Sequence, residues 1–156
     1  MLKVSDIDVY YGDLQTLRGV SIRVEAGEVV SVIGSNGAGK SSLLKTISGM
    51  LRPRRGSISL NGIEISHAPP SRIVEQGISH VPEGRQIFPT MTVLENLEMG
   101  AQFPRTQNAQ QETMQQVFGY FPRLEERLNQ KAGEINRNVT NIRCAAEEDS
   151  SRPGSL

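Results

Sequence analysis

A glycine-rich loop between an apolar segment and a helical pattern is the feature that most restricts how this chain folds. Residues 34–42 read GSNGAGKSS and directly follow the short apolar segment 29–33. Such a segment is typical of a strand buried on both faces. After the loop, Leu43, Leu44 and Ile47 recur at helical spacing. We therefore expect a strand, a tight loop and a helix in succession, as in proteins of the α/β class.

The loop fits the pattern G-x-x-x-x-G-K-[ST], which predicts a site for nucleotide phosphates. Glycine lets the backbone curl around a phosphate group, so that successive N–H groups point inward at the anion. The positive end of the following helix adds to this attraction. Lys40 is expected to reach the β- and γ-phosphates, and Ser41 to offer its hydroxyl to Mg²⁺. The predicted nucleotide-binding residues of the loop are Gly34, Ser35, Asn36, Gly37, Ala38, Gly39, Lys40, Ser41 and Ser42.

The composition is that of an ordinary globular chain and argues against several classes of function. Lys plus Arg and Asp plus Glu number 17 each, so no basic excess points to a nucleic-acid partner. No apolar run approaches the roughly 18 residues that a membrane helix needs, and the N-terminus lacks the pattern of a secretory signal. The single cysteine, Cys144, fits a reducing compartment. We expect a cytoplasmic protein.

The rest of the chain carries alternating strand and helix patterns. An Asn61-Gly62 pair between two short strand patterns predicts a hairpin. After Pro104, a glutamine-rich helical pattern gathers apolar residues on one face, which is expected to be core. The remaining predictions are strands within 2–9, 20–24, 57–60, 63–65 and 78–81, a solvated turn at 52–55, and helices within 71–76 and 93–101; the apolar stripe comprises Met114, Val117, Phe118, Phe121, Leu124 and Leu128.

Three segments in a fixed order resemble a known family. They are YYG at 10–12, GEVVSVIGSNGAGKSSLLKTISG at 27–49 and GISHVPEGRQIFPTMTVLENLEMGA at 77–101. Together they resemble the nucleotide-binding subunits of ABC transporters, and most closely an ATP-binding subunit of bacterial branched-chain amino acid importers. The resemblance covers residues 1–133. It implies an α/β P-loop NTPase fold, an incomplete N-terminal part of an ABC ATPase: a core sheet with antiparallel strands and the start of a helical subdomain.

The resemblance also assigns roles to individual residues. Tyr11 matches the aromatic residue that stacks on adenine, and a π-face against a base tolerates any base identity. Glu83 stands where most ABC ATPases have the glutamine of the Q-loop, and its oxygens can approach a hydrated metal. The implied cofactors are ATP and Mg²⁺, with Ser41 and Glu83 on the metal side. Arg85, by contrast, is expected to be an ordinary solvated charge.

The resemblance implies partners as well as ligands. Subunits of this family pair with a second ATP-binding subunit and with transmembrane permease subunits. Each nucleotide then lies between the P-loop of one subunit and the signature sequence of the other. When assembled, the protein would be peripheral on the inner face of the cell membrane, although the cargo would be selected by other subunits.

The chain departs from the family pattern after Glu134. Residues 135–138 read INRN where the family has its signature, L-S-G-G-Q or a close variant. None of the four aspartates, Asp6, Asp8, Asp13 and Asp149, follows an apolar run, so the chain shows no Walker B segment. The switch histidine of the family is missing too. We expect residues 134–156 to be a divergent, poorly ordered tail that does not support pairing, and no catalytic residue in this chain.

Three hypotheses follow for function. In the first, the chain is a truncated or frameshifted ATP-binding subunit of an importer, whose intact relatives couple ATP hydrolysis to transport. A reading-frame shift near codon 135 would explain the departure. In the second, it is a catalytically inactive nucleotide-binding module. In the third, it is a non-functional fragment, because a segment 29–33 without its neighbouring strand leaves an unpaired edge and uncovered apolar surface.

Overall fold

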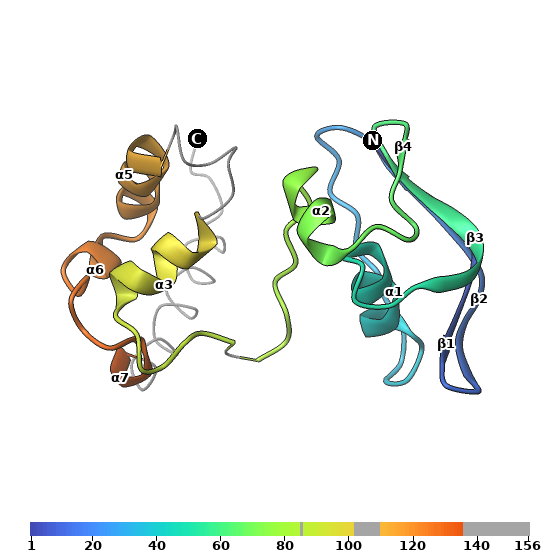
Figure 1. Cartoon of the computed structure of the whole chain (residues 1–156), viewed down its shortest axis with the longest axis horizontal. Helices are drawn as coiled ribbons and strands as arrows, with labels where there is room; N and C mark the ends of the chain where they lie inside the picture. Colours follow the sequence, from blue (N-terminus) through green and yellow to red (C-terminus); the bar gives the residue numbers. More distant parts are fainter. Residues whose placement is uncertain (85, 102–109, 136–156) are drawn as a thin grey trace, which may run out of the picture. The chain divides into compact units, whose positions relative to one another are not determined.

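The computed structural model describes residues 1–84, 86–101 and 110–135. The chain divides into two compact units, Met1–Val81 and Pro82–Leu156 (Figure 1). The first unit contains β1 (Leu2–Tyr11), β2 (Leu14–Val24), α1 (Lys40–Ile47), β3 (Pro53–Leu60), β4 (Ile63–Glu64) and α2 (Pro70–Glu75). The second contains α3 (Val93–Gly100), α5 (Gln110–Tyr120), α6 (Pro122–Glu125) and α7 (Ala132–Ile135). Within these described ranges, no helix is long and apolar enough to cross a membrane.

The first unit is built on a four-stranded sheet in the order β2-β1-β3-β4. Each neighbouring pair is antiparallel, and β1 in the middle pairs with both β2 and β3. Asn61 and Gly62, with φ of 51° and 83°, form the turn between β3 and β4. Positive φ at both turn positions is what an Asn-Gly hairpin requires. The hairpin predicted from this dipeptide is therefore confirmed.

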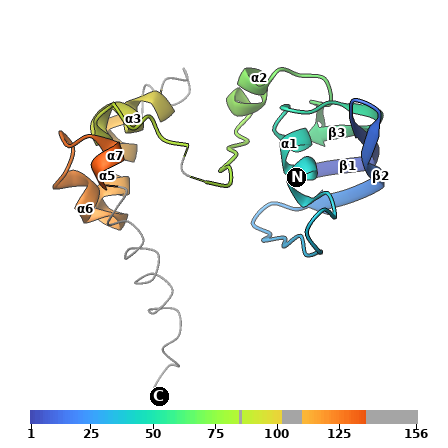
Figure 2. The same cartoon turned by 90° about the horizontal axis from the view of Figure 1, so that it is seen from below.

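The core of this unit lies between the sheet and the helices α1 and α2. Ile7 and Val9 of β1 are fully buried, and Leu43 of α1 and Ile73 of α2 belong to the same apolar cluster. Figure 2 shows α1 lying beside the strands of the sheet. Full burial of an aliphatic side chain of this size stabilises a fold by about 1.5–3 kcal/mol. The apolar residues of β1 and those on one side of α1 thus pack into the same core.

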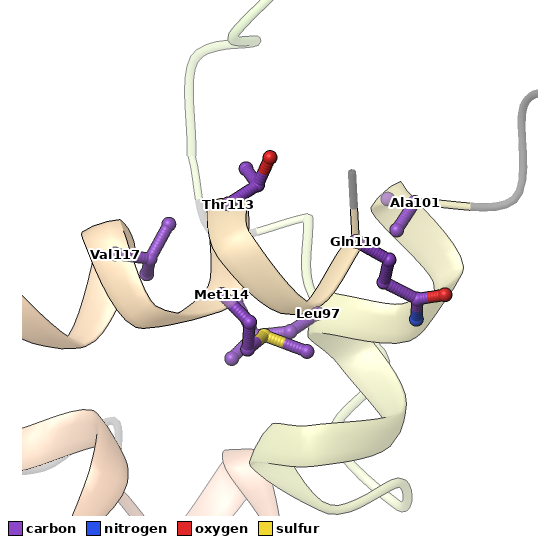
Figure 3. A pocket seen from close by; sticks show the side chains of 7 residues that line it. Leu97, Ala101, Gln110, Thr113, Met114 and Val117 are labelled. Atoms are coloured by element: carbon purple, nitrogen blue, oxygen red, sulfur yellow. The ribbon is translucent and has the colours of Figure 1, made fainter. Parts of the chain in front are cut away.

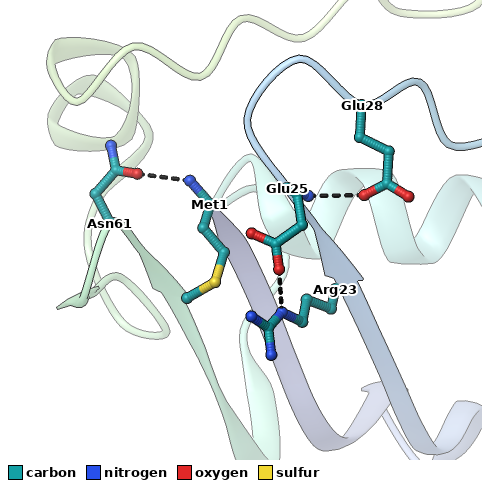
Figure 4. A network of polar contacts seen from close by, with 5 residues as sticks. All are labelled: Met1, Arg23, Glu25, Glu28 and Asn61. Atoms are coloured by element: carbon teal, nitrogen blue, oxygen red, sulfur yellow. Dashed lines mark hydrogen bonds and ion pairs between the residues drawn. The ribbon is translucent and has the colours of Figure 1, made fainter.

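Polar contacts hold the end of β2 and join the start of the chain to the turn between β3 and β4 (Figure 4). The Glu28 carboxylate accepts a hydrogen bond of 2.8 Å from the Glu25 backbone N–H, and the Arg23 guanidinium pairs with the Glu25 carboxylate. The terminal amine of Met1 donates to the Asn61 side chain over 2.7 Å. The turn at Glu25–Glu28 leads the chain out of β2 toward the glycine-rich loop.

Two predicted strands are wrong. Residues 29–33 and 78–81 run outside the sheet. Val29 and Ile33 are each 93% exposed, and Val81 is 88% exposed. A strand that is buried on both faces needs a hydrogen-bonded neighbour and a covering layer, and the described residues supply neither here. The uncovered apolar surface expected for 29–33 is confirmed.

The turn predicted at 52–55 is also wrong, because β3 begins at Pro53. Pro53 is buried opposite Val9, and proline is compatible with the first position of a strand. Arg55 forms an ion pair of 2.9 Å with Asp6. Pairing with β1 thus extends β3 through a charged stretch whose local composition favours a turn.

In the second unit, α3 begins at a capping box. Thr92 Oγ1 accepts from the Glu95 backbone N–H over 3.2 Å, and the Glu95 carboxylate accepts from the Thr92 backbone N–H over 2.7 Å. The Thr92 backbone hydrogen bond, with the Thr92 hydroxyl, lowers the pKa of Glu95. The Asn96 side chain adds a bond to the backbone carbonyl of Phe88 over 3.0 Å. Side chains at the start of α3 thereby hold the segment that precedes this helix.

The apolar stripe of α5 and α6 is confirmed as core only in part. Met114, Val117, Phe118, Leu124 and Leu128 are half-buried, whereas Phe121 is 51% exposed. The buried residues of this unit are instead Val93, Ala132 and Ile135. Backbone hydrogen bonds join residues 93–94, at the start of α3, to residues 128–130, shortly before α7. The core thus centres on α3 and α7.

The loop before α1 is packed against β2 at Gly39. Gly39 has a φ of 90°, and a Cβ atom there would lie 2.6 Å from Leu17 Cδ2 and 2.8 Å from the Thr16 carbonyl oxygen. Gly37 has a similar φ of 86° but open space around it. Positive φ therefore favours glycine at both positions. At Gly39 a side chain would also clash with β2.

We expect Gly39→Ala to destabilise the chain more than Gly37→Ala. Positive φ costs an alanine about 1–2 kcal/mol at either position, and the clash with Leu17 and Thr16 adds a further 1–3 kcal/mol, roughly the cost of overpacking, at Gly39 alone. Urea unfolding followed by circular dichroism measures both values. Equal losses of unfolding free energy in the two variants would show that the loop is not held against β2.

Candidate nucleotide-binding site

The candidate site is the loop of residues 34–39 and the first turn of α1. A backbone bond of 3.2 Å from Ala38 N–H to the Ser35 carbonyl closes the loop. At Gly34, a Cβ atom would lie 3.1 Å from the Cβ of Ala38, so the two sides of the loop approach closely. Gly37 and Gly39 supply the positive φ values. The glycines of the pattern thus form the tight loop that the sequence predicts.

α1 begins directly after this loop, with Gly39 at its N-cap. No side chain caps this helix end by a hydrogen bond, and its first turn carries no acidic residue. The backbone N–H groups of a first helical turn have no partner within the helix, and the helix dipole favours an anion beside them. This end of α1 therefore suits a phosphate group.

Lys40 curls back over the loop. Its Nζ donates to the carbonyl oxygen of Gly34 over 2.7 Å and to that of Ser35 over 2.8 Å. An ammonium group has three donors, so these two bonds do not exhaust it. The positive charge is thus held over the loop, beside the helix end, where a phosphate would meet both. The glycine loop, the uncapped start of α1 and the Lys40 ammonium group are together chemically suited to a nucleoside triphosphate.

Tyr11 lies at the end of β1, opposite Leu14 of β2, and is 44% exposed. Leu17 pairs with Val9, two residues earlier on β1, and also contacts the position of the Gly39 Cβ. Two residues along a strand span about 7 Å. The sheet therefore brings Tyr11 to the same end of the unit at which the loop packs against β2. Its role as the adenine contact stays a prediction.

Sequence reasoning missed Arg54, which belongs to the segment predicted as a solvated turn. Its guanidinium carbon lies 4.4 Å from the centroid of the Tyr10 ring. Its Nη2 also donates to the carbonyl oxygen of Gly12 over 2.6 Å. The pairing of β1 with β3 places Arg54 there, and no short-range pattern in the sequence indicates it.

The geometry of the loop tests neither the predicted role of Glu83 nor the predicted metal site. Glu83 is exposed and belongs to the second unit, so its role beside a metal shared with Ser41 stays a prediction. The described part of the chain contains no group of three or more His, Cys, Asp or Glu side chains that could hold a metal ion. Arg85, Cys144 and most of the predicted tail, residues 136–156, lie outside the described residues.

A small cavity of about 140 Å³ lies between α3 and α5 (Figure 3). Leu97 and Met114 point into it from the two helices. None of the residues that line it carries an ionisable side chain. None of the predicted site residues takes part. The cavity is therefore a gap in packing between two helices, and the glycine loop remains the candidate site.

Comparison with known proteins gives the family of this chain. The family model described as "ABC transporter" matches residues 17–145. The high-affinity branched-chain amino acid transport ATP-binding protein BraG of Pseudomonas aeruginosa is 44% identical over 136 residues. That alignment covers 87% of this chain and 58% of BraG. The chain thus spans less than two thirds of this curated relative.

Solved structures give the same result for the fold. A nucleotide-free ATP-binding cassette from an ABC transporter superposes with a TM-score of 0.71 at 30% identity, covering 86% of this chain and 58% of the cassette. The dimeric bacterial ABC transporter cassette MJ0796 has a TM-score of 0.57 at 26% identity, covering 64% of this chain and 46% of that one. The predicted P-loop NTPase fold, as part of an ABC ATPase with antiparallel strands and helices, is confirmed.

The family match covers well over half of the 156 residues and includes the whole glycine loop and α1. It runs 12 residues past Gly133, to residue 145, so the division predicted between residues 133 and 134 stays a prediction. The ordered segments that resembled nucleotide-binding subunits in sequence carry the matching fold in three dimensions. On these grounds, this chain belongs to the ABC transporter family of ATP-binding proteins.

Proposed function

We propose that these residues form the nucleotide-binding part of an ABC importer ATPase for branched-chain amino acids. The single observation that carries the binding function is the Lys40 ammonium group, held by the carbonyls of Gly34 and Ser35 over a glycine loop at a helix start. The importer function and its cargo class rest on the similarity to BraG, which is named for branched-chain amino acid transport.

Each residue of the site has a physical role in binding. The loop N–H groups and the first turn of α1 would hold the phosphates, and Lys40 would neutralise the β- and γ-phosphates. Ser41 would offer its hydroxyl to Mg²⁺, and Glu83 would approach the same hydrated ion. Mg²⁺ held by these residues would supply positive charge that offsets the negative charge of the phosphates. Tyr11 would stack on adenine.

Transport would require partners that this chain does not contain. We propose a second ATP-binding subunit and permease subunits at the inner face of the membrane as the partners, although residues 135–138 read INRN where the family has the signature that faces the second subunit. The dimeric state of the related cassette MJ0796 supports the first pairing. The similarity to a transport protein supports the second. Nothing in the charge balance favours a nucleic-acid partner.

A second candidate function is a nucleotide-binding module that does not hydrolyse ATP. Residues 135–138 lack the two glycines of the family signature. Hydrolysis of a triphosphate needs groups that position water and neutralise developing charge. Binding uses the loop, which is present and well formed, so binding and hydrolysis can be separated by experiment.

Replacing Lys40 tests the binding function. We expect Lys40→Ala to weaken Mg-ATP binding about 10- to 100-fold, because a hydrogen bond from a charged donor contributes about 1.5–3 kcal/mol. Isothermal titration calorimetry measures the dissociation constants. Lys45→Ala is the matched control, since Lys45 is an exposed lysine in the last turn of the same helix. Equal affinity in Lys40→Ala and the parent would contradict the assignment of the loop.

Phosphate release tests hydrolysis. We expect the 156-residue chain to release phosphate from Mg-ATP no faster than its Lys40→Ala variant, even at concentrations that saturate the loop. Release clearly faster than in this variant, and dependent on Mg²⁺, would refute the inactive module. It would show that the chain itself supplies the groups needed for cleavage.

A further inference from the structure

The turn that joins β1 and β2 is held on both sides of Tyr11 by one side chain from β3. The Arg54 guanidinium lies over the ring of Tyr10, the residue before Tyr11, at 4.4 Å. The same guanidinium donates a hydrogen bond of 2.6 Å to the carbonyl of Gly12, the residue after it. Arg54 is 42 residues away from this carbonyl along the chain. The contact is therefore a tertiary one, formed only when β3 pairs with β1.

This contact adds a restraint from β3 to the end of the β1–β2 hairpin. Gly12 has a φ of 57° with open space where a Cβ would be, so the turn itself offers little steric restraint. Successive side chains of a strand point to opposite faces, and Tyr10 and Tyr11 pair in regular register with Gln15 and Leu14. Arg54 thus covers one face, where Tyr10 is half-buried, and leaves the 44% exposed Tyr11 ring on the other.

We propose that Arg54 is a positioning residue for nucleotide recognition: by holding Tyr10 and Gly12, it fixes the backbone of Tyr11 so that the Tyr11 ring meets the base of a nucleoside triphosphate. Fixing a contact residue before binding lowers the entropy lost on binding. The effect is confined to the base, because the phosphates meet the glycine loop and Lys40. This inference rests on the proposed function, in which Tyr11 contacts adenine.

A comparison of two ligands separates the base from the phosphates. We expect Arg54→Ala to raise the dissociation constant for Mg-ATP about three- to tenfold, because the Tyr11 side chain would then lose conformational freedom on binding instead of being held beforehand. Binding of inorganic tripolyphosphate with Mg²⁺ should be unchanged. Calorimetric titration of both ligands measures this, and circular dichroism checks that the fold is retained.

Two variants control for charge and chemistry. Arg55→Ala removes the same charge from the next position, where the side chain pairs with Asp6 at the surface, and should leave both ligands unaffected. Arg54→Lys keeps a cation that can lie over Tyr10 and donate to Gly12, so it should restore part of the affinity for ATP. A general loss of charge near the site would instead weaken ATP binding in Arg54→Ala and Arg55→Ala alike, which would overturn the proposal.

Tyr11 variants distinguish failure of this inference from failure of the proposed function. Tyr11→Ala should weaken ATP binding and leave tripolyphosphate binding unchanged, and adding Arg54→Ala to it should cause no further loss. If Tyr11→Ala binds ATP as the parent does, the adenine contact is wrong and the inference falls with it. If Tyr11→Ala weakens ATP binding but Arg54→Ala does not, the positioning role alone is refuted. Equal loss of both ligands in Arg54→Ala would show a merely structural role.

Discussion

The pairing of β1 with strands on both of its sides is the constraint on which the first unit depends. Ile7 and Val9 are fully buried only because β2 and β3 complete the sheet around them. The pairing with β2 sets Leu17 opposite Val9, and Leu17 is the side chain against which the glycine loop closes. The pairing with β3 brings Arg54 to the turn that carries Tyr11. The central strand thus places both parts of the candidate site.

The glycine loop itself depends on a second constraint, the absence of a side chain at Gly39. The loop packs so tightly on β2 that a Cβ atom would overlap Leu17 and the Thr16 backbone. This contact fixes where α1 begins, and Lys40 is its first residue. From that position Lys40 reaches back to the carbonyls of Gly34 and Ser35. The shape of the candidate phosphate site is therefore a consequence of backbone packing, and the Lys40 side chain adds the positive charge.

The apolar segment that enters the loop has no such support in the described chain. Val29 and Ile33 are almost fully exposed, and their backbone N–H and C=O groups join no strand. Exposed apolar side chains and unpaired backbone groups favour association with another strand or surface. The glycine loop is formed beside this segment, so the shape of the loop does not depend on a strand at residues 29–33.

Features that depend on nearby residues could be predicted from the sequence. The Asn61-Gly62 turn, the start of α1 at the glycine loop and the helix within 93–101 were predicted because positive φ, helical spacing and apolar periodicity are local properties. Contacts between distant parts of the chain determine which segments become strands and which side chains meet. Residues 29–33 have strand composition without a partner, and β3 extends through Arg54 because β1 pairs with it. Hydrogen bonds between strands join residues far apart in sequence, so no local pattern can reveal them.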